Sequence, residues 1–410
     1  MSISIGEKYI GYTTDKNLLE KSEHGGVIVS LLRYALKSRL VDFVVILKKR
    51  NNSRFDGILT ATSNPEEVME AVGALHCVTP NIAKFVKKYM DGAKDKKIAL
   101  TVKPCDAKAI IELAKRNQIN LDNLLLVGVN CTGTFNPTTF KKMLIDEFSV
   151  KPEEVVGEEI EDNKLIIKLK DGRILEKNLR ELEEKGYGRR ENCRYCETPI
   201  PKMADLAVGK WGTGNRKASL IEVCSEKGVN LLRMAVDANV IHIEKPSLED
   251  IRERERKYRD AIEDAKYWQE KNLKPLKEAS LEEKMKYWFS HFNRCIKCFG
   301  CRDSCPICYC VECILEARRS LVKAGEIPPE KLFPAVRITH VVDSCIGCGQ
   351  CQDACPMEIP LIKLAYIINS EIKPIFKYEA GQDVKEKPPL ITVTDKELSI
   401  PETELEPGML

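Results

Sequence analysis

The sequence lacks a large net charge, a long apolar run and an export signal. Its 65 Lys and Arg residues against 62 Asp and Glu residues give a net charge of +3, which provides no general field for nucleic acid. No apolar run reaches the ~18–20 residues that a membrane-spanning helix needs. The N-terminal segment has no apolar stretch behind a basic start, so it predicts no signal peptide. The 43% hydrophobic content excludes a wholly disordered or collagen-like chain.

Cysteine is the residue type that the sequence has in excess. There are 17 cysteines, and eleven of them fall between Cys295 and Cys355. A disulfide framework needs an oxidising compartment and is typical of small secreted domains, which a chain of 410 residues without an export signal does not resemble. The thiols are therefore predicted to be reduced and bound to metal, in a cytoplasmic metalloprotein.

The first part of the chain alternates helix and strand patterns. Helices are predicted over 26–40, 64–75, 106–116 and 227–238, and strands over 41–47, 97–102, 123–129, 206–208, 220–223 and 240–244. This alternation predicts an α/β core with a mostly parallel sheet. Segments 164–170 and 173–177 flank Asp171-Gly172, which tolerates a type I′ turn and so predicts a β-hairpin.

The composition changes after the core. Half of residues 251–290 are charged, with mixed signs, and this pattern predicts a solvated helical connector. We expect a core over 1–245, a connector over 246–290, an α+β ferredoxin-like domain of the bacterial two-cluster type over 291–370, and a tail over 371–410. The tail is rich in proline, and we expect it to be extended and either to wrap a neighbour or to stay mobile.

Two segments repeat one cysteine spacing, followed in both cases by proline. They are Cys295-x2-Cys298-x2-Cys301-x3-Cys305 and Cys345-x2-Cys348-x2-Cys351-x3-Cys355. In the bacterial ferredoxin pattern the fourth cysteine binds the other cluster. The spacing therefore predicts one 4Fe-4S cluster on Cys295, Cys298, Cys301 and Cys355, and a second on Cys345, Cys348, Cys351 and Cys305. Structural zinc usually uses two ligand pairs with a longer spacer, which fits this spacing poorly.

Other cysteines leave two interpretations open. Cys308, Cys310 and Cys313 follow the first motif and could bind a further metal or pack as small hydrophobes, which we favour because no fourth ligand is evident nearby. Cys105 and Cys131 end two predicted strands, whose carboxyl ends line one crevice in an α/β sheet. With Cys193 and Cys196 they could hold a third 4Fe-4S cluster or a zinc ion.

Five segments carry a family resemblance: HGGVIVSLL, LHCVTPNI, KPCDAKAI, VGVNCTGTF and CRYCETPIPKMADLAVGKWG. In this order they resemble the beta subunits of coenzyme F420-reducing hydrogenases and F420-dependent formate dehydrogenases. The position of a two-cluster ferredoxin part after the core is similar to that in the formate dehydrogenase beta subunits. The resemblance implies FAD, a site for coenzyme F420, and a 4Fe-4S cluster on Cys105, Cys131, Cys193 and Cys196. Asp106 and the Val29-Ser30 pair depart from the usual family pattern without removing a cluster ligand.

Residue chemistry and the resemblance together suggest where a flavin binds. Glycines precede one predicted helix, whose open N–H groups suit a phosphate, and form a second turn near a possible phosphate-binding lysine. Either glycine loop is also compatible with an ordinary turn, and His76 with an ordinary polar loop residue. The predicted cofactor-binding residues are Gly25, Gly26, Ser30, His76, Pro80, Asn81, Gly209, Gly212, Gly214 and Lys217. Cys224 and His242 are predicted to be structural.

The resemblance also implies a mechanism and partners. A flavin can exchange two electrons with a deazaflavin and single electrons with iron–sulfur clusters, so no side chain is predicted to be catalytic. Formate oxidation needs a molybdenum or tungsten pterin centre, which implies a formate dehydrogenase alpha subunit as partner. A hydrogenase, a heterodisulfide reductase complex or ferredoxin is an alternative partner. An alternative of another class is a zinc-stabilised assembly module without turnover.

Overall fold

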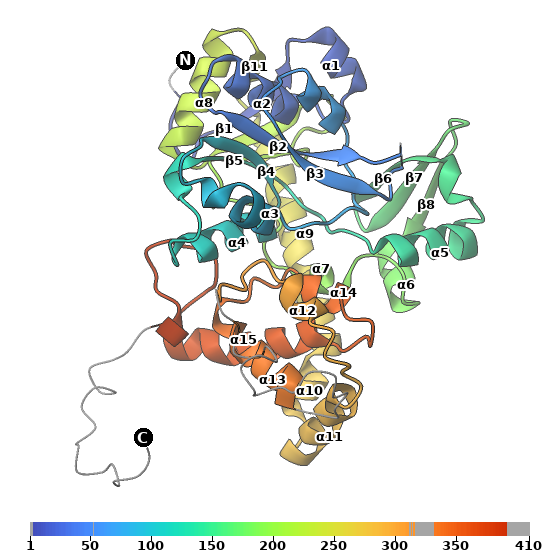
Figure 1. The fold of residues 1–410 in the computed structure, drawn as a ribbon. Coiled ribbons are helices and arrows are strands. Elements are labelled where there is room, and N and C mark those ends of the chain that lie inside the picture. Colours follow the sequence, from blue (N-terminus) through green and yellow to red (C-terminus); the bar gives the residue numbers. More distant parts are fainter. Residues whose placement is uncertain (1–2, 52, 311–312, 314, 316–331, 392–410) are drawn as a thin grey trace, which may run out of the picture.

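The computed structural model describes residues 3–51, 53–310, 313, 315 and 332–391. The core contains an eight-stranded sheet of order β11-β1-β10-β9-β5-β4-β2-β3 (Figure 1). Its strands are β1 (Lys8–Thr13), β2 (Phe43–Lys49), β3 (Gly57–Thr62), β4 (Ile98–Val102), β5 (Leu124–Val129), β9 (Leu206–Gly209), β10 (Ser219–Val223) and β11 (Ile241–Glu244). The core helices are α1 (Lys16–Lys21), α2 (Val27–Lys37), α3 (Ile82–Tyr89), α4 (Pro104–Ala114), α5 (Pro137–Phe148), α6 (Leu179–Glu184), α7 (Glu191–Arg194) and α8 (Glu226–Asp237).

Helices cover both faces of this sheet because its central strands are apolar on both sides. Val44 of β2 packs in a buried cluster with residues of α2 and α8, whereas Val45 packs with residues of α3 and α4. Successive residues of a strand point to opposite faces, so two apolar neighbours require two helical layers. This arrangement leaves the carboxyl ends of β2, β4 and β5 as the edge where loops gather.

The core is the predicted α/β sheet with parallel strands at its centre, and its flanking strands make the sheet mixed. Only the central run β2, β4, β5 and β9 is parallel, and β1, β3, β10 and β11 join through antiparallel pairs. β1 and β3 were not predicted. The predicted helix over 64–75 is a short 3-10 helix over Glu67–Ala71. The other predicted core elements agree with the structure to within a few residues.

A second sheet of three antiparallel strands stands beside the core. It has the order β6 (Val155–Glu161), β7 (Lys164–Leu169) and β8 (Ile174–Asn178). β7 and β8 form the predicted hairpin, and Gly172 in its turn has a φ of +86°. Residues of α5 and α6 pack on the same sheet in one buried cluster. β6 was not predicted, and it supplies the carboxylates that approach the core.

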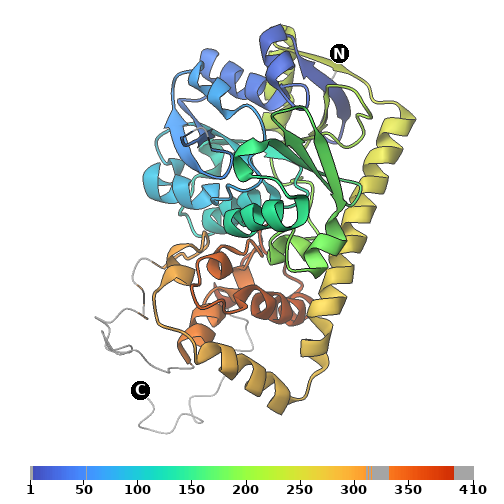
Figure 2. The same cartoon turned by 90° about the vertical axis from the view of Figure 1, so that its right-hand side faces the viewer.

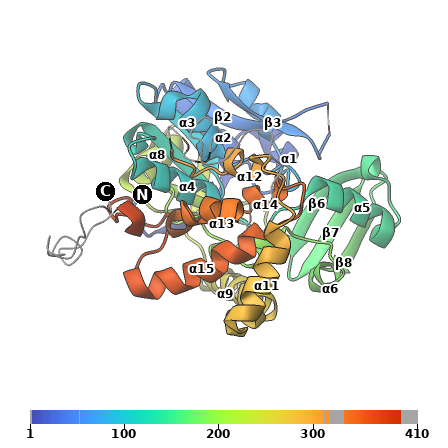
Figure 3. The same cartoon turned by 60° about the horizontal axis from the view of Figure 1, so that its bottom comes forward.

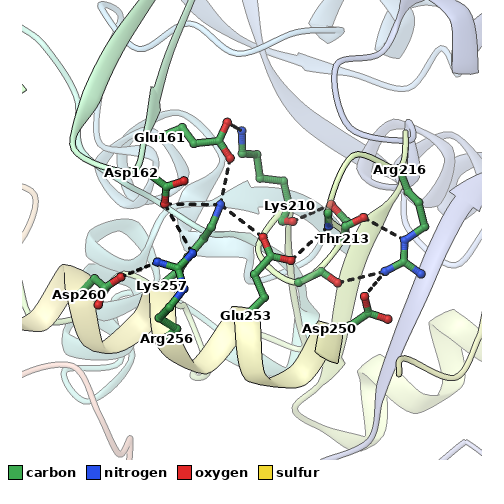
Figure 4. A network of polar contacts seen from close by, with 12 residues as sticks. Glu161, Asp162, Lys210, Thr213, Arg216, Asp250, Glu253, Arg256, Lys257 and Asp260 are labelled. Atoms are coloured by element: carbon green, nitrogen blue, oxygen red, sulfur yellow. Dashed lines mark hydrogen bonds and ion pairs between the residues drawn. The ribbon is translucent and has the colours of Figure 1, made fainter. Parts of the chain in front are cut away.

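The predicted charged connector is a set of three helices, α9 (Leu248–Asn272), α10 (Lys274–Glu278) and α11 (Leu281–Phe292). In Figure 2, α9 runs along one side of the molecule from the core to the cysteine-rich part. It is not simply solvated, since Arg254, Ala265 and Trp268 are buried. Lys257 lies 2.9 Å from Glu161 and 3.4 Å from Glu253, in the polar network of Figure 4.

The cysteine-rich part lies below the core in Figure 1 and comes forward in the view of Figure 3. Its helices are α12 (Gly300–Asp303), α13 (Leu332–Thr339), α14 (Gln350–Asp353) and α15 (Leu361–Phe376). Within 291–310, 313, 315 and 332–370 no strand is assigned, so the strands expected of an α+β ferredoxin domain are not seen in the described part. The two short helices α12 and α14 each follow a cysteine loop.

The tail begins later than predicted and contacts the chain itself. α15 continues to Phe376, beyond the predicted boundary at residue 370. Glu112 of α4 accepts hydrogen bonds from Tyr378 Oη at 2.7 Å and from Gly381 N at 2.7 Å. Residues 377–391 therefore fold back onto the core, and the predicted tail beyond 391 lies outside the described residues. In the described part of the chain, we find no helix with the length and apolarity of a membrane span.

Candidate functional site

Four cysteines from separate parts of the core line one cavity of about 260 Å³, which we call the core cysteine cavity. Cys105 lies in the first turn of α4, Cys131 follows β5, and Cys193 and Cys196 lie in and after α7. β4 and β5 are parallel neighbours, so their carboxyl ends bring Cys105 and Cys131 to the same edge of the sheet. Residues 378–380 of the C-terminal segment complete the wall. The four predicted core cysteines therefore meet in the structure.

Burial raises the pKa of the thiols around this cavity. The pKa of Cys131 rises to about 12, and the neighbouring Cys193 thiol adds to the effect of burial. Burial also raises the pKa of Cys105 and Cys196. Thiolates so enclosed need positive charge beside them, which the iron of a cluster provides. The donor set therefore fits a 4Fe-4S cluster.

A second set of cysteines lines a smaller cavity in the cysteine-rich part. Cys295, Cys298 and Cys301 of the first motif share it with Cys355 of the second motif. Phe299, Phe333 and Arg337 are further lining residues, and Arg337 Nη2 donates to Cys301 O at 3.3 Å. The fourth cysteine of the second motif thus lies with the first three of the other motif, as the crossed ferredoxin pattern predicts.

The remaining motif cysteines also lie close together. Burial raises the pKa of Cys345 to about 11 and raises that of Cys348 and Cys351, and the Cys305 thiol contributes to all three rises. Cys305 of the first motif is therefore a neighbour of the three second-motif cysteines. The Cys105 thiol of the core also contributes to the raised pKa of Cys348. This set lies nearer to the core cysteine cavity than the Cys295 set does.

Direct contacts hold the second motif against the α7 loop. The buried Arg190 donates from Nη2 to Cys348 O at 3.0 Å and forms a close ion pair with Asp353. Gly349 has a φ of +73°, and a Cβ there would overlap the side chain of Asn192. Asn192 directly precedes Cys193, so the backbone of the second-motif loop lies against a side chain of the core cysteine loop. Because Gly349 follows Cys348 and Asn192 precedes Cys193, this contact places the Cys345 set and the core cysteine set side by side.

A third cavity, of about 320 Å³, opens at the carboxyl edge of the core sheet beside α2. We call it the edge cavity. Gly26, His76, Pro80 and Gly209, all predicted cofactor-binding residues, line it. Its apolar walls include Val27, Leu47 and Leu59, which suit a flat ring system. Cys131, Thr132 and Gly133 line both this cavity and the core cysteine cavity. One short segment therefore separates the cysteine set from the apolar cavity.

Comparisons with known proteins place this geometry in a family. Residues 8–85 and 95–249 match the N-terminal and C-terminal parts of the coenzyme F420 hydrogenase/dehydrogenase beta subunit, and residues 291–359 match a 4Fe-4S dicluster domain. The F420-dependent formate dehydrogenase subunit beta of Methanocaldococcus jannaschii is 46% identical over 93% of this chain and 97% of its own length. The chain belongs to the coenzyme F420 hydrogenase/dehydrogenase beta-subunit family.

Two further proteins agree with this assignment. The F420-dependent formate dehydrogenase 1 subunit beta of Methanococcus maripaludis is 40% identical over 94% of this chain and 97% of its own length. A chain of the F420-reducing [NiFe] hydrogenase complex from Methanosarcina barkeri has a TM-score of 0.56 at 18% identity, covering 67% of this chain and 94% of that chain, and so shares the fold. The resemblance seen in the sequence is confirmed, and this member of the family is a component of an oxidoreductase.

Several predicted cofactor residues of this family member are not among those that line the edge cavity. Gly25 has a φ of +76°, and a Cβ there would lie 2.8 Å from Ala218 Cα. Glycine at this position therefore lets the backbone pack closely against Ala218. The buried Ser30 donates from Oγ to Thr13 Oγ1 at 2.6 Å. Asn81 caps α3 by accepting from Ala83 N at 3.0 Å. The local fold thus explains these three residues without a cofactor.

The second glycine-rich turn, over 210–217, contacts helix α9. Gly212 has a φ of +85°, and a Cβ there would overlap Asp250 O. Gly214 N donates to Glu253 Oε2 at 3.2 Å. Lys217 Nζ donates to Glu20 O at 2.8 Å. Since none of these residues lines the edge cavity, the turn joins the connector to the core and is less suited to a flavin phosphate.

The structure adds polar residues that the sequence did not single out. Lys103 lines the edge cavity and its Nζ lies 2.6 Å from Asp106 Oδ2. Asn130 also lines it, and its buried Oδ1 accepts no hydrogen bond from the described residues. An unpaired buried acceptor in a cavity wall suits a ligand that carries an N–H donor, as a flavin ring does. Asn130 directly precedes Cys131, so its position next to a predicted cluster ligand could have identified it from the sequence.

Three of the remaining cysteines pack as hydrophobic residues. Cys308 packs against the buried cluster under α3 and α4, and Cys313 packs beside Leu315 and Phe333. Cys224 packs beside Trp211. No group of three or more His, Cys, Asp or Glu residues in the described part of the chain is placed to hold a single metal ion. Cysteines that bind different irons of a cluster are spread around a cavity, as the core set and the Cys295 set are.

Proposed function

We propose that this chain carries electrons between a formate-oxidising partner subunit and coenzyme F420, through three 4Fe-4S clusters and one FAD. The observation that carries this proposal is the segment 131–133, which lines both the core cysteine cavity and the edge cavity. A flavin in the edge cavity would be separated from a cluster by one stretch of backbone. When bound, FAD would exchange a hydride with the deazaflavin and single electrons with the cluster.

The positions of the three cysteine sets support one order of electron transfer. The Cys295 set lies farthest from the core, the Cys345 set lies against the α7 loop through Arg190 and Cys348, and the core set adjoins the edge cavity. Electrons from a partner would enter at the Cys295 set and leave at the edge cavity. Cys298 is exposed, which suits the outermost position. In the reverse reaction the same order runs backwards.

The residues of the edge cavity are suited to hold and orient a flavin. Gly26 lies at the N-terminus of α2, where a φ of +68° turns the backbone into the helix. The apolar strand residues would stack on the ring, and Asn130 would accept a hydrogen bond from it. Lys103, bound to Asp106, would place a positive charge beside the cysteine set. These side chains bind and orient, and none of them needs to act as a nucleophile.

The partner is a formate dehydrogenase alpha subunit that holds a molybdenum or tungsten pterin centre. Two relatives, 46% and 40% identical to this chain, are named F420-dependent formate dehydrogenase beta subunits. A hydrogenase or heterodisulfide reductase complex is the alternative partner of the same redox class. The cysteines need a reducing compartment, so we place the complex in the cytoplasm.

An anaerobic preparation of the isolated chain tests the proposal. It should hold about twelve irons per chain, as three clusters of four, and one FAD. Reduced coenzyme F420 should then reduce an artificial one-electron dye without an alpha subunit and without formate. A colourless preparation that holds zinc would favour the assembly-module alternative. Iron near eight with full FAD content would remove the core cluster from the proposed path.

A further inference from the structure

A buried ion pair joins the second sheet to the core next to the edge cavity. The side chain of Glu158 on β6 is fully buried, and its Oε2 accepts from Arg54 Nε at 2.9 Å. Arg54 also donates from Nη2 to Ala74 O at 2.8 Å. A buried charge pair of this kind contributes little net stability, although the loss of one partner is costly. Its position between the second sheet and the cavity wall therefore calls for a functional explanation.

The other oxygen of Glu158 holds His76. Glu158 Oε1 accepts from His76 N at 3.2 Å and lies 3.4 Å from His76 Nδ1. His76 O in turn accepts from Phe135 N at 2.9 Å, and the two rings meet edge to face with centroids 6.4 Å apart. The backbone of His76 is thus fixed by two hydrogen bonds and its ring by the contact with Phe135, whereas the buried Nδ1 lies near Glu158 without forming a hydrogen bond in the described residues. His76 lines the edge cavity, so Nε2 is the ring nitrogen left for that cavity.

Glu158 is the charged group that lies closest to the His76 ring. Burial opposes ionisation of Glu158, but its contacts with His76 and Arg54 lower the pKa of this carboxyl below its usual range. The neighbouring Cys77 thiol is buried and its pKa is raised, so it stays neutral, with Lys141 as a further nearby cation. An ionised carboxylate beside an imidazole stabilises the imidazolium. Imidazole is also the side chain that gains and loses a proton near neutral pH.

The proposed reaction needs such a group. Reduction of coenzyme F420 takes up two electrons and two protons, whereas iron–sulfur clusters deliver electrons alone. Both protons must therefore come from water through the cavity. Among the titratable residues lining it, Lys103 and Asp106 are paired with each other, Cys131 belongs to the core cysteine set, and Glu23 accepts from Ala74 N.

Two histidines then remain as candidates. His24 has a 41% exposed side chain and lies 3.5 Å from Glu159, whereas the side chain of His76 is 22% exposed and fixed by its backbone and by Glu158. A proton donor must be held in one geometry to act efficiently. The more enclosed and better fixed histidine is His76.

We infer that His76 relays protons between water and the edge cavity, with Glu158 and Arg54 as positioning residues. This inference rests on the proposed function. For each coenzyme F420 reduced, His76 passes two protons in turn and regains each from water, so the ring returns to its starting state. On oxidation of the reduced coenzyme the protons leave by the same ring. The two electrons come from the partner, and no further reactant is needed.

The test uses the complex with its partner, formate and coenzyme F420. His76→Gln should lower the rate of coenzyme F420 reduction about 100-fold, the range of general acid–base catalysis, with FAD and iron content unchanged. Imidazole added to His76→Ala should restore part of the rate. His242→Gln is the control, because His242 lies on the edge strand β11 and packs on Tyr12, away from the cavity. Its rate should equal that of the wild type.

A second measurement is independent of turnover. The chain has five histidines, so their ring signals can be titrated by NMR and His76 identified by its loss in His76→Gln. Glu158→Gln should move the titration of His76 to lower pH and shift the pH profile of the rate in the same direction. Glu158→Gln leaves the buried Arg54 without its ion-pair partner. The double variant Arg54→Gln/Glu158→Gln removes both charges, so it repeats the test without an unpaired buried charge.

The outcomes separate this inference from the proposed function. If the wild-type complex does not reduce coenzyme F420 with formate, the proposed function fails. If the wild type is active and His76→Gln retains its rate, the proton relay at His76 is wrong. A slow His76→Ala that imidazole does not restore, with an unchanged His76 titration in Glu158→Gln, would leave His76 and Glu158 with a structural role only and would overturn the inference.

Discussion

Gly349 is the residue at which the cysteine-rich part touches the core most closely. Its φ of +73° favours glycine, and a Cβ would overlap Asn192 in the α7 loop. Gly349→Ala should therefore displace the Cys348 loop from the core set. We expect electron transfer to the flavin to slow at least tenfold, measured by stopped-flow reduction from the partner side, with all three clusters still present.

A matched glycine gives the control for this experiment. Gly172 in the β7–β8 turn has a φ of +86°, and no atom lies within 4 Å of a Cβ placed there. Gly172→Ala carries the same backbone strain without the overlap, so it should lower stability slightly and leave electron transfer unchanged. Asn192→Ala/Gly349→Ala should recover part of the rate. Equal effects of the two glycine variants would show that strain, and not the contact, is responsible.

Cys193 separates the core cluster from the ferredoxin pair. It lines the core cysteine cavity and neither lines the Cys295 cavity nor neighbours Cys305. Cys193→Ser should lower the iron content from about twelve to about eight per chain, and formate-dependent reduction of coenzyme F420 should fall sharply. Iron analysis and electron paramagnetic resonance of the reduced protein measure the loss. A normal reduction rate in this variant would contradict the proposed order of electron transfer.

At the residue scale, the spacing of the cysteines predicted the site better than the composition of the glycine-rich loops did. The two ferredoxin motifs predicted which cysteines would meet, because a cluster loop is built from neighbours in sequence. The role of the turn over 210–217 in flavin binding stays a prediction, and the structure adds that Gly212 allows close approach of helix α9. Glu158 was invisible in the sequence, because its partner His76 lies 82 positions away and the two meet only through the packing of β6.

The connector helix α9 is the element whose environment the sequence did not predict. Half of its region is charged, which suggested solvent on all sides, but those charges pair with the core. Lys257 has a side chain only 9% exposed and approaches Glu161, Asp162 and Glu253. Figure 4 shows this network extending to Lys210, Thr213 and Arg216 of the glycine-rich turn. Charge pattern alone does not say whether the opposite charges come from the same helix or from another element.

Lys257 provides a test of this element. Lys257→Met removes the shared cation and leaves three carboxylates close together, so the free energy of unfolding should fall by about 1–3 kcal/mol. Arg259→Ala, an exposed position on the same helix, is the control and should change it by less than about 0.5 kcal/mol. Chemical denaturation at neutral pH under anaerobic conditions measures both. An equal response of the two variants would argue that α9 is held by its apolar contacts alone.

The same network has a defined pH dependence. Burial opposes ionisation of Glu161, but hydrogen bonds from Lys210 and Lys257 lower its pKa to about 2. A carboxyl with a lowered folded-state pKa stabilises the fold above its unfolded pKa, and this contribution is lost as the pH falls toward 2. The stability difference between the wild type and Glu161→Gln, about 1 kcal/mol for a partly exposed pair, should therefore stay constant from pH 8 to pH 5. A difference that shrinks within this range would show that Glu161 titrates normally.

At the scale of the whole molecule, the sheet core and the cysteine-rich part form one continuous path. Cys355 lies at the far end of that path, in the cavity of Cys295, Cys298 and Cys301. Cys355→Ala should remove or alter that cluster and sharply reduce coupling to the partner. Reduction of the flavin by reduced coenzyme F420 should continue at the wild-type rate in stopped-flow traces, since the core set is intact.

The control for this variant is Cys310→Ala, at an exposed cysteine that lines neither of the two cysteine cavities nor the edge cavity. It should keep all its iron and its coupling to the partner. If Cys355→Ala abolished flavin reduction with normal FAD content, the division into a flavin core and a ferredoxin relay would be wrong. If Cys310→Ala lost iron, Cys308, Cys310 and Cys313 would need to be reconsidered as ligands.

The C-terminal segment that completes the core cysteine cavity also has a consequence for biosynthesis. Cys105 and Cys131 leave the ribosome early, whereas Tyr378 and Ala380, which line the same cavity, are translated more than 240 residues later. The cavity therefore remains open on that side while most of the chain is already made. We expect iron and sulfide to enter the cavity from this side, because the contact of Tyr378 with Glu112 closes it only once the C-terminal segment is made. A chain truncated before residue 378 would keep every cysteine but would leave its core cluster accessible to oxygen.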